Sequence, residues 1–201
     1  MLTSLPIAFA EGFSLDSVAH PAMVELEKQY AVRLVDGPEQ LAARGLLLAI
    51  QPRAFPAERL VALDTWVRDG GRIVLLADPS LGWESERPLG DVLRPPAAFP
   101  DTGLLKHWGL TLYAPEKAGP QTGTLSGHEV ITGSPGTLAS SIGNCRIEDS
   151  GLVARCRIGD GWAVVIADAD FLNLRGSGAL DGPTSENLSA LLAVLSSLPA
   201  K

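Results

Sequence analysis

Residues 46–83 decide the fold of this chain, and they read LLLAIQPRAFPAERLVALDTWVRDGGRIVLLADPSLGW. The first run, Leu46–Ile50, is short and wholly apolar, which is typical of a strand covered on both faces. Ala57–Asp69 has apolar residues at helical spacing and ends at a glycine pair, so it predicts a helix. Arg72–Ala77 is a second buried strand. Strand, helix and strand in this order predict a βαβ unit with parallel strands.

The composition indicates a globular protein of one domain, residues 1–201. Apolar residues make up 46% of the chain and charged residues 19%. The net charge is −7 and no basic cluster occurs, which argues against nucleic acid or an anionic membrane surface as a partner. No apolar run approaches the ~20 residues that span a bilayer. No motif implies a cofactor.

The remaining elements extend this unit at both ends of the chain. Strands are expected at Leu5–Ala10 and Val32–Val35, and a further buried strand at Ala163–Ala167, parallel to the first two. Ser185–Leu198 carries an apolar stripe and predicts a closing helix. Between residues 113 and 158, short alternating runs rich in Gly, Ser and Thr predict a small antiparallel β elaboration.

Two cysteines flank a predicted turn inside this elaboration. Cys145 and Cys156 lie on either side of Asp149-Ser150-Gly151, which is typical of a hairpin. A four-residue loop would pair the two cysteines directly, at a separation that a disulfide bridges. Two alternatives stay open: a cross-strand disulfide, which an oxidising compartment favours, or two small buried thiols.

Three motifs taken together resemble one family. They are residues 62–72 with 77–79, residues 104–110, and residues 161–172, whose central parts read LDTWVRDGGR, LLKHWGL and GWAVVIADADFL. This pattern resembles the extracytoplasmic domain of auxiliary proteins of uncharacterised ABC-type transport systems, a group that includes the gliding-motility auxiliary subunit.

The resemblance implies a fold, a role and a location. Such domains are similar to class I glutamine amidotransferases without their catalysis, so the expected fold is α/β, a flavodoxin-like three-layer sandwich with a mostly parallel sheet. The implied role is that of a non-enzymatic accessory or binding domain. Its partners would be the permease or ATPase subunits, or a second copy. The expected location is periplasmic or otherwise extracytoplasmic, with the cytoplasm as the alternative and any membrane attachment through a segment absent from this chain.

The amidotransferase likeness raises the question of a nucleophile. A catalytic Cys would occupy the tight turn after a buried strand, but the turn after Arg72–Ala77 holds Asp78-Pro79-Ser80. Ser80 lacks the preceding glycine of a nucleophile elbow. The three histidines, at positions 20, 107 and 128, are isolated, and no Cys-x-x-Cys occurs, so zinc is not expected. We therefore expect no catalytic residues.

Polar residues follow the presumed strands. The carboxyl ends of parallel strands share one edge of a sheet, where ligands bind in open α/β folds. Carboxylate and amide oxygens there can hold Mg²⁺, Ca²⁺ or a polar ligand, and the alternative function is therefore a small-ligand binder or a hydrolase-like enzyme. The same residues can instead serve as structural turn formers and caps. These rim residues are Glu11, Gln51, Asp78, Ser80, Asp168 and Asp170.

A long segment, residues 80–100, follows the strand end at Asp78 and is rich in Pro and Gly. Loops of this length are uncommon in compact domains unless they have a function. Trp83, Leu89 and Phe99 are the candidate partner surface on this loop. The alternative is that these side chains cover the core.

Overall fold

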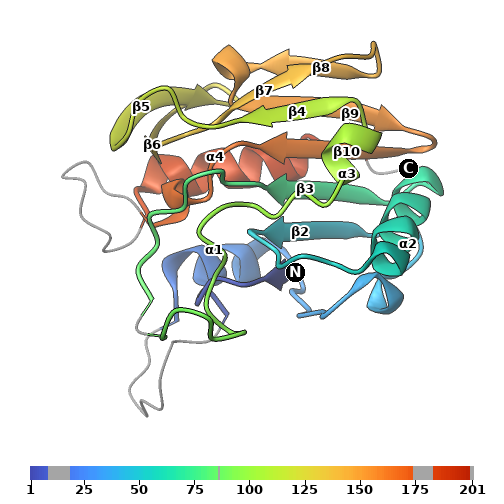
Figure 1. Cartoon of the computed structure of the whole chain (residues 1–201), viewed down its shortest axis with the longest axis horizontal. Coiled ribbons are helices and arrows are strands. Elements are labelled where there is room, and N and C mark those ends of the chain that lie inside the picture. Colours follow the sequence, from blue (N-terminus) through green and yellow to red (C-terminus); the bar gives the residue numbers. More distant parts are fainter. Residues whose placement is uncertain (9–18, 86, 174–182, 200–201) are drawn as a thin grey trace.

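The computed structural model describes residues 1–8, 19–85, 87–173 and 183–199. It is a mixed α/β structure built on a six-stranded sheet of order β1-β2-β3-β10-β9-β8 (Figure 1). β1, β2, β3 and β10 are parallel, whereas β9 runs antiparallel to β10 and β8 antiparallel to β9. The strands are β1 Leu2–Thr3, β2 Leu46–Ile50, β3 Arg72–Leu76, β8 Cys145–Glu148, β9 Val153–Ile158 and β10 Gly161–Ile166.

The predicted βαβ unit is confirmed. β2 pairs in parallel with β3, and β3 pairs in parallel with β10. Helix α2, Ala57–Arg68, connects β2 to β3 and ends where Gly70 adopts a φ of 101°. This left-handed conformation lets the N–H of the next residue, Gly71, donate to the Trp66 carbonyl at 3.0 Å, which closes the helix. The chain can then enter β3 directly.

Helices cover both faces of the sheet, which explains why the central strands are apolar throughout. Alternate residues of each strand enter two separate core clusters, because successive side chains point to opposite faces. One cluster joins the sheet to α1 (Pro21–Gln29) and α4 (Ser185–Ser196). The other joins it to α2 and to the short α3 (Leu104–His107), as Figure 1 shows.

The antiparallel elaboration consists of two small sheets rather than one unit. β4 (Leu110–Tyr113) pairs with β7 (Thr137–Ser140), and β5 (Pro120–Leu125) pairs with β6 (His128–Gly133). β8 and β9 lie within the predicted elaboration 113–158 but extend the main sheet as its antiparallel edge. The described residues also include three short 3₁₀ helices: η1 Pro38–Gln40, η2 Asp149–Gly151 and η3 Asp170–Leu172.

Two expectations near the N-terminus are wrong. The first strand is β1, Leu2–Thr3, rather than 5–10. Leu5 and Ile7 are apolar because they enter the core from a turn, and residues 9 and 10 lie outside the described residues. Residues 32–35 form no strand, although the Val35 N–H donates to the Met1 carbonyl at 3.0 Å. In the described part of the chain, no helix is long and apolar enough to cross a membrane.

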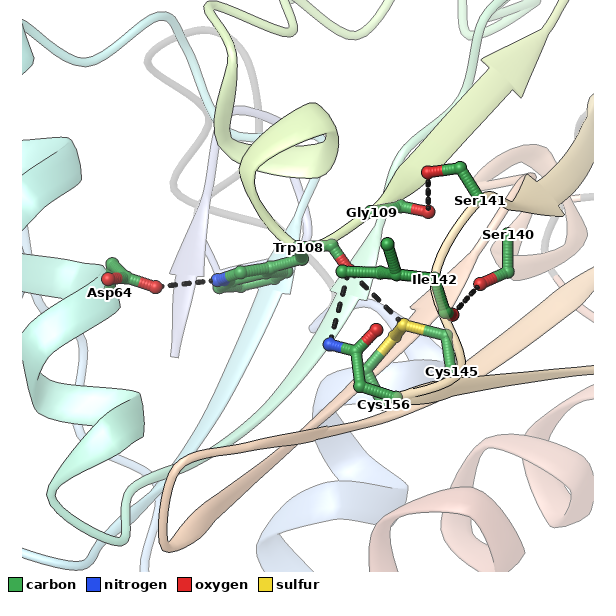
Figure 2. The surroundings of a disulfide bond; sticks show 9 residues. Asp64, Trp108, Gly109, Ser140, Ser141, Ile142, Cys145 and Cys156 are labelled. Atoms are coloured by element: carbon green, nitrogen blue, oxygen red, sulfur yellow. Dashed lines mark hydrogen bonds between the residues drawn. A yellow bond between two sulfur atoms is a disulfide. The ribbon is translucent and has the colours of Figure 1, made fainter.

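The predicted cysteine hairpin is confirmed. Cys145 and Cys156 are register partners on β8 and β9, four loop residues separate the strands, and the two sulfurs form a disulfide with a Cα–Cα distance of 4.0 Å. Figure 2 shows the Trp108 indole between this disulfide and α2. Its Nε1 donates to Asp64 Oδ1 at 2.8 Å. The disulfide, α3 and α2 thus lie next to one another along the same face of the main sheet.

Candidate functional site

The polar rim residues gather where β2, β3 and β10 end, as the parallel order of these strands requires. The side chains of Gln51, Asp78 and Asp168 are fully buried, and that of Asp170 is 2% exposed. Such burial is exceptional for carboxylates and requires compensation by hydrogen bonds. Glu11, the remaining acidic rim residue from the sequence, lies outside the described residues.

Gln51 links the end of β2 to the end of β3 by hydrogen bonds. It adopts a φ of 43°, which turns its side chain toward the neighbouring strand end. Its Oε1 accepts from the Asp78 N–H at 2.9 Å, and its Nε2 donates to the carbonyls of Asp78 at 3.1 Å and Pro96 at 3.2 Å. The amide uses both of its ends on backbone groups, so Gln51 stabilises the rim and holds the loop 80–100 against it.

Asp78 joins β3 to the segment that follows β10. Its Oδ1 accepts from the Ser80 N–H at 2.8 Å, which is the turn that the sequence indicated. Its Oδ2 accepts from the backbone N–H groups of Ala169 at 2.8 Å and Asp170 at 3.4 Å. The contribution of Ser80 to this site comes from its backbone. Both carboxylate oxygens of Asp78 are therefore occupied by backbone donors.

The other two carboxylates hold neighbouring segments. Asp168 accepts from the Gly133 N–H at 2.8 Å and from the Phe171 N–H at 2.7 Å, so it connects β10 to β6 and to η3. Asp170 Oδ2 accepts from the Gly82 N–H at 2.7 Å and so fixes the start of the loop 80–100. Asp170 Oδ1 is buried and has no hydrogen-bond partner among the described residues.

Burial raises the pKa of all three carboxyl groups. The pKa of Asp78 rises to about 6 because the group is desolvated, although its backbone donors oppose the shift. The pKa of Asp170 rises to about 7 through burial and the nearby charge of Asp78. Burial and the charges of Asp78 and Asp170 raise the pKa of Asp168 well above its usual range. Burial therefore shifts all three groups toward their protonated form.

The arrangement does not create a metal site in the described part of the chain. No group of three or more His, Cys, Asp or Glu side chains there is placed to hold a metal ion. Each carboxylate instead points an oxygen at a backbone N–H of a different segment. Of the two uses that the sequence left open, the described hydrogen bonds support turn formation and capping.

The described contacts of the three histidines do not pair a histidine base with a Ser or Cys nucleophile. His20 caps α1 by accepting from the Ala22 N–H at 3.2 Å, and burial lowers its pKa. His107 lies 3.4 Å from the Asp64 carboxylate, and His128 lies 3.1 Å from that of Glu186. Both cysteines are in the disulfide. Within the described residues, these ring contacts include no Ser or Cys side chain.

The surface of the loop 80–100 differs from the expectation at one position. Trp83 is 9% exposed and lies against His20 in a tilted ring contact with 5.6 Å between ring centroids, so its selection as an exposed anchor is wrong. The indole instead covers the cluster beneath α1 and α4. Phe99 is partly buried against the opposite cluster. Leu89 is 89% exposed, and Val92 beside it is 81% exposed.

Two polar residues that hold separate segments together escaped the sequence reasoning. Asn187 is fully buried in α4; its Oδ1 accepts from the Ile131 N–H and its Nδ2 donates to the Ile131 carbonyl, both at 3.0 Å. The feature of the sequence that could have indicated this role is a polar amide side chain next to the apolar stripe of the predicted closing helix. The second residue is Arg155 on β9, which forms an ion pair with Glu148 at 2.8 Å. Apart from the alternation of a strand, no local pattern in the sequence indicates this pair.

No family model matches this chain, and no curated protein matches it either. Several solved structures resemble it. The exo-β-1,4-mannosidase Op5Man5 from Opitutaceae bacterium strain TAV5 is 13% identical with a TM-score of 0.56, over 100% of this chain and 36% of that one. The β-galactosidase from Rahnella sp. R3 is 12% identical with a TM-score of 0.54, over 89% of this chain and 26% of that one.

A third similar structure is a separate domain of comparable size. The mmIFT52 N-terminal domain is 12% identical with a TM-score of 0.52, and the match covers 89% of this chain and 90% of that one. By contrast, this chain spans about a third of the mannosidase and about a quarter of the galactosidase. At these identities the likeness shows the fold alone.

Proposed function

We propose that this chain is a non-enzymatic accessory domain of an ABC-type transport system, with a flavodoxin-like arrangement, and that it acts by binding another protein. The proposal starts from the resemblance of residues 62–72, 104–110 and 161–172 to the auxiliary proteins of such systems. The parallel strands β1, β2, β3 and β10, with helices on both faces of the sheet, support the layered α/β part of this proposal.

One observation carries the non-enzymatic part of the proposal. The turn after β3, where a class I amidotransferase relative would place its nucleophile, holds Asp78, and both carboxylate oxygens accept from backbone N–H groups. A general base or nucleophile must be able to reach a substrate atom. Asp78 is fully buried, so it is available to neither role. Among the described rim carboxylates, the oxygen without a hydrogen-bond partner, Asp170 Oδ1, is buried as well.

The disulfide supports a location outside the cytoplasm. Cys145 and Cys156 are bonded across β8 and β9, and such bonds persist in oxidising compartments. A cytoplasmic protein would keep these thiols reduced. In the proposed setting, attachment to the membrane comes from a segment outside this chain, and the domain projects into the periplasm or its equivalent.

The loop 80–100 offers an apolar contact for a transporter subunit. Leu89, Val92 and Leu93 are 89%, 81% and 52% exposed and follow one another closely. Exposed apolar side chains grouped in this way are typical of protein contacts. In this location the proposed partners are the permease subunit, which crosses the membrane, or a second copy of the chain.

The proposal is tested by cross-linking in cells that make the full-length protein at its natural level. Supporting results are cross-links from this domain to an ABC-type permease, together with a bonded Cys145–Cys156 pair after thiol blocking of intact cells. Absence of transporter subunits among the cross-linked proteins, or turnover of glutamine or of aryl glycosides by the purified chain, contradicts it.

A further inference from the structure

The hairpin β5–β6 has one covered edge and one open edge. On the covered edge, the Ile131 N–H donates to Asn187 Oδ1 at 3.0 Å and the Gly133 N–H donates to Asp168 Oδ2 at 2.8 Å. Among the described strands, β6 is the sole neighbour of β5. The open edge of this small sheet is therefore β5.

The register shows which backbone groups of β5 point outward. In an antiparallel pair, residues alternate between exchanging hydrogen bonds and pointing their N–H and C=O groups away from each other. The backbone N–H and C=O of Ile131 bond to Asn187 and so point away from β5. The backbone groups of its register partner Thr122 must then point away from β6, and those of Thr124 do so by alternation. Among the described residues, none is bonded to these outward groups of Thr122 and Thr124.

This edge lies along a polar hollow of about 550 Å³, which is within the range of ligand sites. The hollow touches four consecutive residues of β5, 121–124. Because alternate side chains point to opposite faces of a strand, a hollow that touches consecutive residues reaches the strand edge. It also extends over the hairpin to Thr132 of β6, the register partner of Gln121. Across from β5 it is bounded by Thr137 on β7 and by Ser150 in η2.

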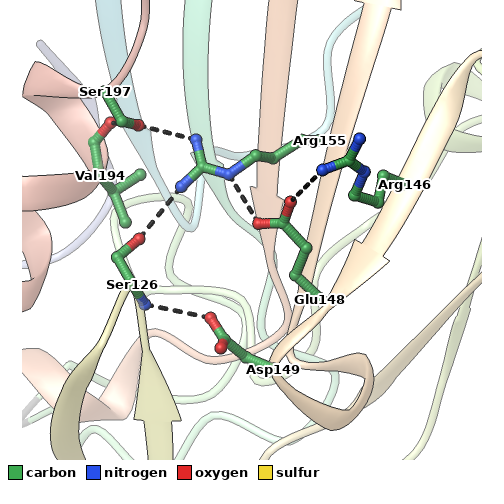
Figure 3. A network of polar contacts seen from close by, with 7 residues as sticks. All are labelled: Ser126, Arg146, Glu148, Asp149, Arg155, Val194 and Ser197. Carbon is green, nitrogen blue, oxygen red and sulfur yellow. Dashed lines mark hydrogen bonds and ion pairs between the residues drawn. The ribbon is translucent and has the colours of Figure 1, made fainter.

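The edge is held in place before any partner arrives. Figure 3 shows Arg155 fixing the tip of the hairpin: it donates to Ser126 Oγ at 3.0 Å and pairs with Glu148 at 2.8 Å. The Ser126 N–H donates to Asp149 Oδ2 at 3.0 Å, so the tip is also tied to η2, the far wall of the hollow. A preformed strand edge lowers the ordering cost of binding.

We propose that β5 binds an extended peptide segment of a partner protein by strand addition, in the hollow between β5 and η2. The outward N–H and C=O groups of Thr122 and Thr124 supply the main-chain ladder. Four strand residues span about 13 Å, so the bound segment has roughly four or five residues. The inference deepens the proposed function, on which it rests for the source of the peptide.

The lining selects the kind of peptide. Threonine, serine and glutamine side chains dominate the walls, which suits small polar side chains. The charged residues of the hollow are Glu116, Asp149 and Lys117, two acidic and one basic, in a chain of net charge −7. A neutral or basic segment therefore complements the site. β5 itself has no charged residue, so apart from Pro120 it lacks the usual protection of an edge strand.

The test uses a displayed library of random peptides of about ten residues, long enough for strand addition. The enriched peptide is synthesised and titrated against the ¹⁵N-labelled chain. Thr122→Pro and Thr124→Pro each remove one outward N–H without removing a bond to β6, a position where edge strands accept proline. Thr122→Val and Thr124→Val keep the N–H and serve as matched controls.

The proposal expects the peptide to bind about ten-fold more weakly to each proline variant, one backbone hydrogen bond being lost, while both valine variants bind as the wild type does. In the wild type, hydrogen exchange at Thr122 and Thr124 should be fast without peptide and slow with it. This readout needs no variant, so a proline variant that fails to fold does not block the test.

Several results overturn the proposal: no peptide enriched, exchange at Thr122 and Thr124 unchanged on binding, or equal affinity of the proline and valine variants. A wild-type dimer that Thr124→Pro dissociates would make a second copy the occupant and overturn the peptide assignment. The two proposals fail separately. Peptide binding at β5 without transporter cross-links contradicts only the proposed function, whereas transporter cross-links from Leu89 without any peptide binding at β5 contradict only the strand addition.

Discussion

The carboxylate of Asp78 accepts a hydrogen bond from the backbone N–H of Ala169 at 2.8 Å, although 91 residues separate the two in the chain. Through this bond the end of β3 holds the segment that follows β10. The same carboxylate accepts from the Ser80 N–H at 2.8 Å. The rim of the sheet is thus a structural junction, and its stability should depend on this side chain.

Replacing Asp78 with Ala should lower the free energy of unfolding by about 3 kcal/mol, because buried N–H groups of Ser80 and Ala169 lose their acceptor. Urea denaturation measures the loss. Asp69→Ala is the matched control, since Asp69 is exposed at the end of α2 and its change should stay within about 0.5 kcal/mol. A D78A midpoint equal to that of D69A would show that the junction contributes nothing.

Stability should fall as pH rises from 5 to 8. Burial raises the pKa of Asp78 to about 6 and that of Asp170 to about 7, whereas an unfolded Asp titrates near 3.8. The folded chain therefore holds protons that the unfolded chain has released, and this contribution, complete below about pH 4, is lost as pH rises through 6 to 7. Thermal melts across this range measure the effect.

Asp170→Asn isolates the contribution of one group. The variant should show a smaller fall in melting temperature between pH 5 and 8 than the wild type, because one titration is removed. His20, whose pKa burial lowers, acts in the opposite direction and is common to both proteins. Asp69→Asn should keep the wild-type profile. Parallel profiles for wild type and D170N would contradict the raised pKa of Asp170.

Removing the disulfide should cost stability through the unfolded state. The bond closes a loop with a sequence separation of 11, so Cys145→Ala combined with Cys156→Ala should lower the free energy of unfolding by about 2–3 kcal/mol. Reductant should lower the wild-type midpoint by a similar amount and leave the double variant unchanged. A wild-type protein insensitive to reductant would show that the bond does not stabilise the fold.

Two residues of the loop 80–100 should behave in opposite ways. Trp83→Ala should lower stability by about 3 kcal/mol or more, because the indole is 9% exposed and packs on His20. Leu89→Ala should change stability by less than about 0.5 kcal/mol, since Leu89 is 89% exposed, while weakening transporter cross-linking. Equal melting temperatures for W83A and wild type would place Trp83 on the surface after all.

The sequence allowed the βαβ unit and the disulfide register to be predicted because both rest on local patterns. The runs that form β2, β3 and β10 are apolar throughout, so they predict strands buried on both faces of a sheet. The four-residue turn places Cys145 opposite Cys156. The gathering of Gln51, Asp78 and Asp168 followed from the parallel strand order. These relations need no knowledge of side-chain contacts.

Other features depend on contacts between distant segments and could not be read in this way. An apolar loop residue such as Trp83 looks the same in the sequence whether it covers the core or faces a partner. Asn187 completes the edge of β6 across 56 residues, and no local pattern names Ile131 as its partner. The use of the rim carboxylates as backbone acceptors likewise depends on segments that meet only after folding.

The most direct test of the account is in-cell cross-linking of the full-length protein, with photo-reactive residues placed at Leu89 and, separately, at Thr122. The account predicts that both positions cross-link to subunits of one ABC-type transporter, and that a position on the exposed far surface, Val61, does not. Cross-links from neither Leu89 nor Thr122 to any transporter subunit, in cells where the protein is folded and its disulfide formed, would contradict it.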